Sequence, residues 1–330
     1  MNIQKSRELY VKKVVESIPP NIKPTNYLMD VLDISKVSAY RRLKCILPFT
    51  YDEMIVLSKE LDFSLDDIIH ADLNEEKAIF SYYKYDYENI HEFFVRMLNN
   101  IYGYIKNQIK TNENIAIISI NHLWIIYVMG YEHLLKFYYF RWMHQMSFNS
   151  YRLLYSEIKL SNEILDLSNK IKEQIYRMKK TVFIIDKNLF FNTLHDIQYF
   201  YRRNIIGYDE LTNIKNDFEK IIQHTESHVL LGKNTMGNLR SFYLSSLNIY
   251  SNSFYIECEE STASFFYQYN PYPFMTLNAN LCAFHREWLE TLKKYSILMT
   301  ASNEALQIDF FSKQRQYLSD LIEDKDLIAT

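Results

Sequence analysis

The chain has 330 residues and a formal net charge of −3, and 48% of its residues are hydrophobic and 16% aromatic. This apolar content is enough for a large core, so it excludes a wholly disordered protein, and the length allows two domains. With only 5 Gly and 6 Pro, glycine-rich phosphate loops and multi-turn β-sandwiches are disfavoured, and a mainly helical architecture is expected.

Cysteine usage and hydropathy indicate a cytoplasmic protein without a membrane segment. The three cysteines lie far apart in the sequence, so neither a disulfide framework nor a CxxC metal pair is expected. The first residues lack the apolar core of a signal peptide. The most apolar segment, 115–129, is interrupted by Asn121 and His122 and falls short of the roughly 20 residues that span a bilayer.

Charge is distributed unevenly over the first seventy residues. Residues 1–50 contain nine Lys or Arg and four acidic residues, a net charge of +5, whereas residues 51–72 contain one Lys and seven acidic residues, a net charge of −6. A helical domain divided in this way could present a basic face to phosphates. A nucleic-acid contact is therefore expected from the basic part.

The first two elements are predicted to be short helices. Segment 3–18 carries apolar residues at helical spacing. Pro24 prevents this helix from continuing through the break that follows it, and Thr25 and Asn26 are suitable residues to start the next helix.

Three more short helices are predicted before residue 70, which makes five in all. Asp33 is expected in the turn after the second helix, because Asp tolerates a left-handed backbone better than most residues. Ser35 is expected to cap a basic helix over 36–44. Thr50 and Ser64 are expected to cap the two helices that close the domain.

Helical periodicity dominates the chain beyond a polar, Tyr-rich connector at 74–90. The predicted helices share apolar residues three and four positions apart, and they lie at 91–109, 131–147, 155–180, 189–204, 209–230, 281–300 and 303–323. Segment 114–119 is a candidate short strand, and 242–280 alternates apolar and polar residues as two or three antiparallel strands do. The predicted fold class is therefore mainly α, with one domain at 1–73 and a larger, mostly helical domain at 91–330 that contains a small antiparallel β-sheet.

The order helix, short turn, helix, followed by two further helices, resembles the Cro/C1-type (XRE-like) helix-turn-helix transcription regulators. The resemblance covers roughly residues 20–70 and is carried by TNYLMDVLDISKVSAYRRLK and LPFTYDEMIVLSKELDFSLDDII. The closing motif, LSKELDFSLDDII, is the more specific part. In this family the second helix of the motif lies in the major groove of DNA, with its N-terminal half toward the base edges.

The resemblance implies a set of DNA contacts at the start of the second helix and along the third. The expected contact residues are Thr25, Ser35, Lys36, Val37, Ser38, Tyr40, Arg41, Arg42 and Lys44. The hydroxyl residues at 25 and 35 and the basic residues at 42 and 44 are expected at phosphates. The four residues named between 36 and 40 would face the groove, and Arg41 would bond a guanine edge or a phosphate.

Two positions depart from the pattern of the family. The turn contains Asp33 where Gly is common. Late in the third helix, Arg42 occupies the position that usually holds an apolar anchor, whereas Ala39 and Leu43 are spaced as a core pair, so the helix could be rotated by part of a turn. Whether Arg42 or one of the two residues before it contacts bases is left open.

These features predict a sequence-specific regulator of transcription that binds double-stranded DNA. A homodimer is expected, because a single motif binds weakly and two motifs read two half-sites. The larger domain would provide dimerisation and the binding of an unidentified small-molecule effector. The alternative is a protein-interaction module whose basic N-terminal bundle docks an acidic partner protein.

The larger domain shows no set of residues that indicates an enzyme, and no catalytic residue, cofactor or metal is expected. Nucleophile elbows, phosphate loops and dinucleotide fingerprints do not occur in the sequence. His224 and His228 lie four residues apart on a predicted helix. Since no third ligand is close in the sequence, a packed or solvated helix is expected there rather than a metal site.

The segments LLKFYYFRW, LHDIQYFYRR, FYIECEE and FHREWLETLKKYSILMT loosely resemble the companion region of uncharacterised bacterial helix-turn-helix regulators. That resemblance implies an architecture and no chemistry. Aromatic residues are concentrated at 137–142, 190–203 and 265–274. Two interpretations remain open for them: the wall of an apolar pocket for a ligand, or ordinary core and dimer interface.

Overall fold

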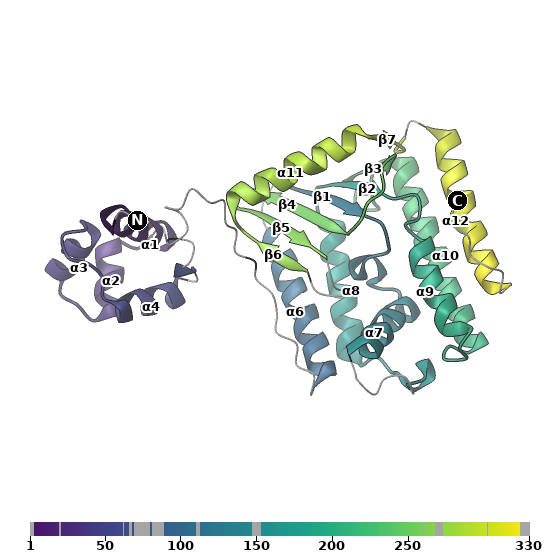
Figure 1. The fold of residues 1–330 in the computed structure, drawn as a ribbon, viewed down its shortest axis with the longest axis horizontal. Coiled ribbons are helices and arrows are strands. Elements are labelled where there is room, and N and C mark those ends of the chain that lie inside the picture. Colours follow the sequence, from purple (N-terminus) through teal and green to yellow (C-terminus); the bar gives the residue numbers. More distant parts are fainter. Residues whose placement is uncertain are drawn as a thin grey trace. The chain divides into compact units, whose positions relative to one another are not determined.

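The computed structural model describes residues 3–19, 21–61, 63–65, 68, 80, 89–109, 113–146, 153–259, 261–267, 273–301 and 303–323. The chain divides into two compact units, residues 1–79 and 80–330, and each is described by itself (Figure 1). Almost all of the connector predicted at 74–90, and most of the helix predicted after Ser64, lie outside the described residues. The described helices include none with the length and apolar character needed to cross a membrane.

Among the described residues of the first unit, four helices surround a small apolar core. They are α1 (Ile3–Ser17), α2 (Pro24–Leu32), α3 (Lys36–Leu43) and α4 (Tyr51–Glu60). Each helix contributes at least one buried side chain, and the buried residues of this core are Tyr10, Val14, Ile18, Leu28, Ala39, Leu57 and Ile68. Tyr10 packs edge to face against Phe49, with 5.1 Å between ring centroids, so the core also includes the segment between α3 and α4.

Local sequence signals set the ends of these helices. Pro24 is the first residue of α2, a position where no backbone N–H is needed, and Thr25 follows it in the first turn. Asp33 ends α2 in the left-handed conformation, with φ 50° and ψ 50°. The Ser35 hydroxyl accepts a hydrogen bond from a backbone N–H in the first turn of α3, at 3.3 Å, and Thr50 caps α4. The predicted turn and both of these caps are therefore confirmed.

In the described part of the second unit, a seven-stranded mixed sheet lies at the centre, in the order β6-β5-β4-β1-β2-β3-β7. The strands are β1 (Asn114–Ile120), β2 (Lys180–Ile185), β3 (Leu239–Ser245), β4 (Ser253–Cys258), β5 (Ser261–Phe266), β6 (Phe274–Thr276) and β7 (Ser296–Leu298). β1, β2 and β3 are parallel neighbours, and the other pairings are antiparallel. The prediction of a small antiparallel sheet is therefore wrong, because the sheet is large and mixed, whereas most of the described secondary structure is helical as expected.

The sheet was underestimated because its central strands have no polar face. Ala116, Ile118 and Ile120 of β1 belong to the core on one side of the sheet. Ile117 belongs to the core on the other side. A strand covered on both faces becomes a short continuous apolar run, which periodicity alone cannot distinguish from a buried piece of helix. β2, with the sequence KTVFII, is hidden in the same way directly after a predicted helix.

Helices cover both faces of this sheet. They are α6 (Ile90–Gln108), the 3-10 helices η1 (Ile125–Val128) and η3 (Tyr155–Glu157), α7 (Glu132–Met146), α8 (Asn162–Arg177), α9 (Phe191–Tyr201), α10 (Tyr208–Leu231), α11 (Ala279–Lys294) and α12 (Glu304–Ile322). Among the described helices, α11 alone covers one face, and the other long helices form the layer on the opposite face (Figure 1). Because α11 connects β6 with β7, which are the two edges of the sheet, it has to cross the whole sheet.

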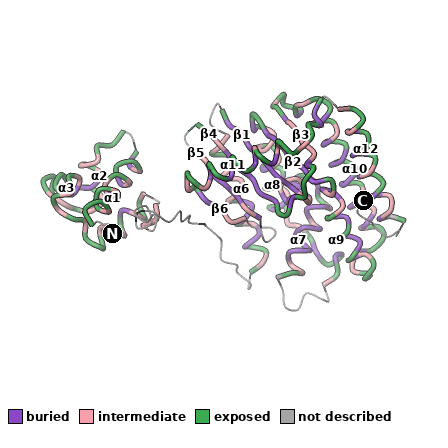
Figure 2. The backbone as a smooth tube through the Cα atoms, turned by 45° about the horizontal axis from the view of Figure 1, so that its top comes forward, coloured by how far each residue is buried: buried purple, intermediate pink, exposed green. Residues whose placement is uncertain are grey.

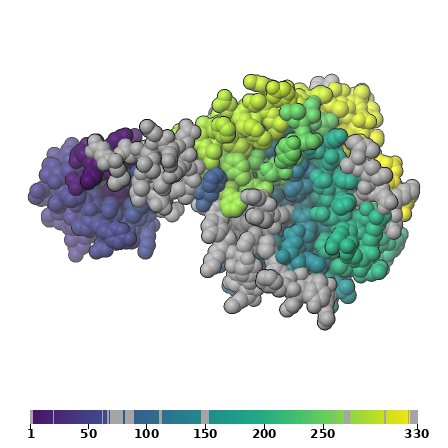
Figure 3. All heavy atoms as spheres, viewed as in Figure 1, coloured from purple at the N-terminus to yellow at the C-terminus, as the bar shows by residue number. Residues whose placement is uncertain are grey.

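Burial follows these layers. Buried residues are concentrated in the strands and on the inward sides of the helices (Figure 2). The outer side of α11 lies at the surface of the unit (Figure 3), where Phe284 and Trp288 are 66% and 44% exposed.

The aromatic concentrations seen in the sequence are packed together. Phe137 and Phe140 contact Phe200 edge to face, with 6.1 Å and 5.0 Å between ring centroids. Phe265 stacks on Phe254 at 4.3 Å. For the described residues of the three segments, these contacts support the core interpretation over the pocket interpretation.

Asp217 joins two helices of the layer. Its carboxylate accepts hydrogen bonds from the backbone N–H groups of His133, at 2.8 Å, and Leu134, at 3.3 Å, in the first turn of α7. The side chain of Asp217 is 6% exposed. A residue in the middle of α10 thus caps a helix that begins far away in the sequence.

We expect Asp217→Ala to lower the free energy of unfolding of the second unit by about 1–3 kcal/mol, because one buried and one partly buried N–H group lose their acceptor. The matched control is Asn216→Ala, at the exposed neighbouring position on α10, which should change stability by less than about 0.5 kcal/mol. Urea unfolding followed by tryptophan fluorescence measures this, since all three tryptophans lie in the second unit. Equal effects of the two variants would contradict the capping role.

Candidate nucleic-acid interface

α3 has an exposed face and a packed face. Successive residues of a helix are rotated by about 100°, so positions 36, 37, 40, 41 and 44 lie on one side, and positions 39, 42 and 43 lie on the other. The side chains of the first group are Lys36, Val37, Tyr40, Arg41 and Lys44, and all five are exposed. Ala39, on the packed face, is completely buried in the core of the first unit.

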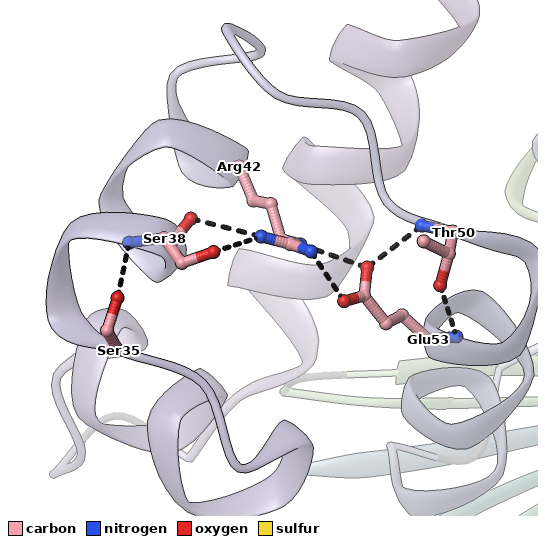
Figure 4. Close-up of polar contacts among 5 residues, drawn as sticks. All are labelled: Ser35, Ser38, Arg42, Thr50 and Glu53. Carbon is pink, nitrogen blue, oxygen red and sulfur yellow. Dashed lines mark hydrogen bonds and ion pairs between the residues drawn. The ribbon is translucent and has the colours of Figure 1, made fainter.

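Arg42 lies on the packed face and is 7% exposed. Its guanidinium forms a bidentate ion pair with Glu53 of α4, with Nε at 2.9 Å from Oε2 and Nη2 at 2.6 Å from Oε1 (Figure 4). Nη1 donates a hydrogen bond to the Ser38 hydroxyl. The position that the family fills with an apolar anchor is therefore filled here by a charged side chain whose charge is compensated inside the unit.

Glu53 serves two purposes at the start of α4. Its Oε2 accepts a hydrogen bond from the backbone N–H of Thr50 at 2.8 Å, and the Thr50 hydroxyl accepts one from the N–H of Glu53 at 3.2 Å. This reciprocal pair is a capping box. Burial by itself would raise the pKa of Glu53, but the hydrogen bonds from Arg42 and Thr50 outweigh it and hold the pKa below its ordinary value. A single carboxylate thus connects α3 to α4.

The nine predicted contact residues fall into three groups. Those exposed to solvent are Ser35, Lys36, Val37, Tyr40, Arg41 and Lys44. Thr25 and Ser38 are half-buried, and the Ser38 hydroxyl is already engaged by Arg42. Arg42 itself is inside the unit. Of the three residues that the sequence left open for base contact, Tyr40 and Arg41 are accessible to DNA, whereas the buried Arg42 is not.

The exposed face of α3 is cationic and aromatic. Lys36, Arg41 and Lys44 supply three positive charges, and α3 contains no acidic residue. The Nζ of Lys44 lies 5.9 Å from the centre of the Tyr40 ring, which places a cation beside an aromatic surface. Basic groups of this kind bind phosphates and the acceptor atoms of base edges.

The sequence analysis did not identify Glu53, although two signals for it were present. One was an arginine at a position that the fold buries, because buried charges are in most cases paired with an opposite charge. The other was Thr50 followed three residues later by Glu53, the spacing of a capping box. Taken together, these signals point to the same carboxylate.

The second unit, in the part that the structure describes, contains no group of three or more His, Cys, Asp or Glu side chains placed to hold a metal ion. The two histidines that are four residues apart on α10 make separate contacts. His224 Nδ1 lies 2.5 Å from the hydroxyl of Tyr131, and the ring of His228 packs against Tyr176 with 5.7 Å between centroids. Both histidines line a cavity described below.

Comparison with known proteins gives no relative: no protein-family model matches the chain, and neither a curated protein nor a solved structure matches it significantly. The resemblance to Cro/C1-type regulators therefore rests on the residues quoted above.

We expect Arg42→Ala to destabilise the first unit, because Glu53 would keep a buried charge without its partner; breaking a buried ion pair in this way costs about 3–5 kcal/mol. Arg41→Ala, at the exposed neighbouring position, is the matched control and should leave stability nearly unchanged. Amide hydrogen exchange of the full-length protein, read in peptides from 3–61, measures both. Unchanged protection in Arg42→Ala would contradict the structural role of this arginine.

The same ion pair makes the stability of the first unit sensitive to acid. Because the pKa of Glu53 is lower in the folded state than in the unfolded state, its contribution is complete above the unfolded value of about 4.3 and is lost as the pH falls through the folded value. Glu53→Gln removes the titrating group. The stability difference between wild type and Glu53→Gln, from hydrogen exchange corrected for intrinsic rates, should therefore shrink below about pH 5. A difference that stays constant with pH would exclude this linkage.

Proposed function

We propose that this protein is a cytoplasmic transcription regulator whose first unit binds double-stranded DNA in a sequence-specific manner. The observation that carries the proposal is the exposed, acid-free face of α3 with its three cations. The major groove is wide enough for an α-helix, and a helix-turn-helix motif places its second helix there. α2, the turn at Asp33 and α3 supply these elements in the required order.

The proposed contacts follow from exposure and position. Lys36, Val37 and Tyr40 face the base edges. Arg41, one turn along the same face, bonds a guanine edge or a phosphate. Lys44 and the hydroxyl groups at positions 25 and 35 bind phosphates, which orient the helix without reading sequence.

The ion pair between Arg42 and Glu53 has an indirect part in this mechanism. It joins the packed face of α3 to the start of α4, so it limits the rotation of α3 about its own axis. A helix rotated by one residue would present a different set of side chains to the groove. The ion pair therefore helps to select which residues reach the DNA.

The second unit is proposed to hold two copies of the chain together. One motif binds weakly, and a symmetric dimer reads two half-sites about 34–36 Å apart. Selection of bound sequences from a pool of random duplexes should then return a palindrome with that spacing, and a non-palindromic consensus would contradict the dimer.

DNA binding should show the salt dependence of phosphate neutralisation. The logarithm of the affinity is expected to fall linearly with the logarithm of the salt concentration, and Lys44→Ala should reduce that slope by about 1. Lys12→Ala is the matched control, because Lys12 is exposed on α1 and lies 3.8 Å from Glu16, which offsets its charge. Fluorescence anisotropy with a labelled duplex measures both slopes.

Arg41→Ala tests which of the two accessible residues, Tyr40 or Arg41, contacts a base. If Arg41 reads a base, this variant should lose about 1–3 kcal/mol of affinity for the selected sequence and discriminate less at one base pair. If no duplex is bound even at about 50 mM salt, where non-specific binding is strong, the proposal fails. The alternative, an interaction module for an acidic protein, would then account for the same basic face.

A further inference from the structure

The second unit contains a cavity of about 120 Å³ between the sheet and helices α8 and α10. Its walls are mainly apolar, and the side chains of Ile118, Phe183, Phe242 and Ile221 are among them. Phe183 and Phe242 are stacked on each other at 4.5 Å. An engineered apolar cavity of about 150 Å³ in another protein holds benzene, so this cavity has the size for a molecule with about one ring.

The charged side chains and the histidines of the cavity lining are basic, and no carboxylate of the described lining offsets them. Lys172, His224, His228 and Arg240 line the cavity, whereas its described lining includes no Asp or Glu. Burial, with smaller contributions from Arg240 and His224, lowers the pKa of His228 to about 4, so His228 is neutral at pH 7. The fully buried positive charge is therefore that of Arg240.

Arg240 is 4% exposed and has no carboxylate partner among the described residues. Nη1 donates to the carbonyl oxygens of Met178 and Leu239, at 2.9 Å and 2.8 Å. Nη2 donates to those of Ile175 and Tyr176, at 3.1 Å and 3.4 Å. Within the described part of the chain, Nε donates no hydrogen bond. Carbonyl dipoles thus hold this guanidinium in place, but its net charge is not neutralised.

A buried charge without a counter-ion is costly, and buried charges are generally paired or coordinate a metal. Burial lowers the pKa of Arg240 to about 10, even though Tyr127 and Tyr176 act in the opposite direction. The side chain therefore remains charged at neutral pH. An anion entering the cavity would meet a cation that is already in position.

Two further polar groups of the lining lack partners. The indole Nε1 of Trp124 and the hydroxyl of Tyr127 are buried and make no hydrogen bond with any described residue. Buried polar groups are hydrogen-bonded in the great majority of cases. Tyr127 lies near enough to Arg240 for each to affect the pKa of the other, so an unpaired hydroxyl and an unpaired cation occur together.

We propose that this cavity binds a small carboxylic acid as its anion, with the carboxylate at Arg240 and Tyr127 and an apolar body of about one ring against Phe183 and Phe242. A carboxylate brings one negative charge, which one buried cation neutralises. A phosphate monoester would bring nearly two charges and a larger hydration shell into a mainly apolar cavity. The ligand class is therefore a monoanion with an apolar body.

The opening of the cavity carries a second cation. His224 is exposed, and Lys172 is half-buried beside it. The stem of Lys172 passes directly over Gly130, where a Cβ would lie 2.5 Å from the Lys172 Cδ. The Nζ of Lys172 then lies 4.3 Å from the centre of the Tyr131 ring. Glycine at position 130 thus lets a lysine lie at the rim, where its charge attracts an anion from solvent.

Binding of the carboxylate is inferred from the cavity and its lining alone. The role of the ligand as an effector of transcription rests in addition on the proposed function. Binding is therefore measured first on the full-length protein without DNA, and the effect of the ligand on duplex affinity is a separate measurement. Failure of DNA binding would leave the first result unaffected.

The test compares benzoate with the neutral, similarly shaped benzamide. Tryptophan fluorescence is the readout, because Trp124 lines the cavity, and thermal unfolding provides a second one. Benzoate should bind saturably with a dissociation constant of about 1 mM or tighter, the order expected for so small a ligand. It should bind at least about tenfold more tightly than benzamide, because hydrogen bonds to charged groups are the stronger ones.

Three variants and one control locate the site. Arg240→Met should abolish the preference for benzoate, whereas Arg177→Met, at an exposed arginine of α8, should retain it. Tyr127→Phe should weaken benzoate binding without loss of stability, since it removes a hydroxyl that has no partner. Ala116→Leu, which adds volume to the lining, should abolish binding of both compounds.

If Arg240→Met does not fold, the comparison of benzoate with benzamide on wild type and on Tyr127→Phe decides the matter. Equal binding of the two compounds would overturn the assignment of an anion. The absence of saturable benzoate binding, or benzoate binding that Tyr127→Phe and Ala116→Leu leave unchanged, would overturn the site.

Discussion

The first unit depends on the ion pair between Arg42 and Glu53, because this contact fixes which side chains of α3 are exposed to solvent. A buried arginine on α3 requires a carboxylate, and the carboxylate that meets it also caps α4. Packing and charge compensation are therefore combined in one contact between two helices. Its consequence is visible on the opposite side of α3, where every exposed side chain from Lys36 to Lys44 is apolar, aromatic or basic.

The second unit is organised by its central parallel strands. Because β1 and β2 are apolar on both faces, they require cover on both sides, and α11 provides one cover by crossing from one sheet edge to the other. The larger helical layer provides the second cover. The cavity lies between the sheet and that larger layer, where strands β1 to β4 face α8 and α10. The same packing that buries the sheet thus leaves a space with a buried guanidinium at its wall.

Sequence reasoning was most successful where the signal is local. The left-handed turn at Asp33 and the caps at Ser35 and Thr50 are determined by neighbouring residues, and the structure contains all three. The size and the mixed pairing of the sheet were not predicted, because strands without a polar face lose the alternation that identifies a strand. Sequence reasoning also missed the partner of Arg42 and the surroundings of Arg240. Arg42 and Glu53 lie only 11 residues apart, so their pairing could have been inferred from the capping-box spacing and from the burial of an arginine. Most of the carbonyl groups around Arg240 belong to residues more than 60 positions away, and only the folded arrangement brings them together.

The described sheet ends on both sides in three-residue strands, Phe274–Thr276 and Ser296–Leu298. A long, unpaired apolar edge would offer a row of free backbone groups to a neighbouring molecule and so promote aggregation. Edges this short offer very few such groups. The apolar centre of the sheet is thereby protected from growing by addition of strands from a neighbouring molecule.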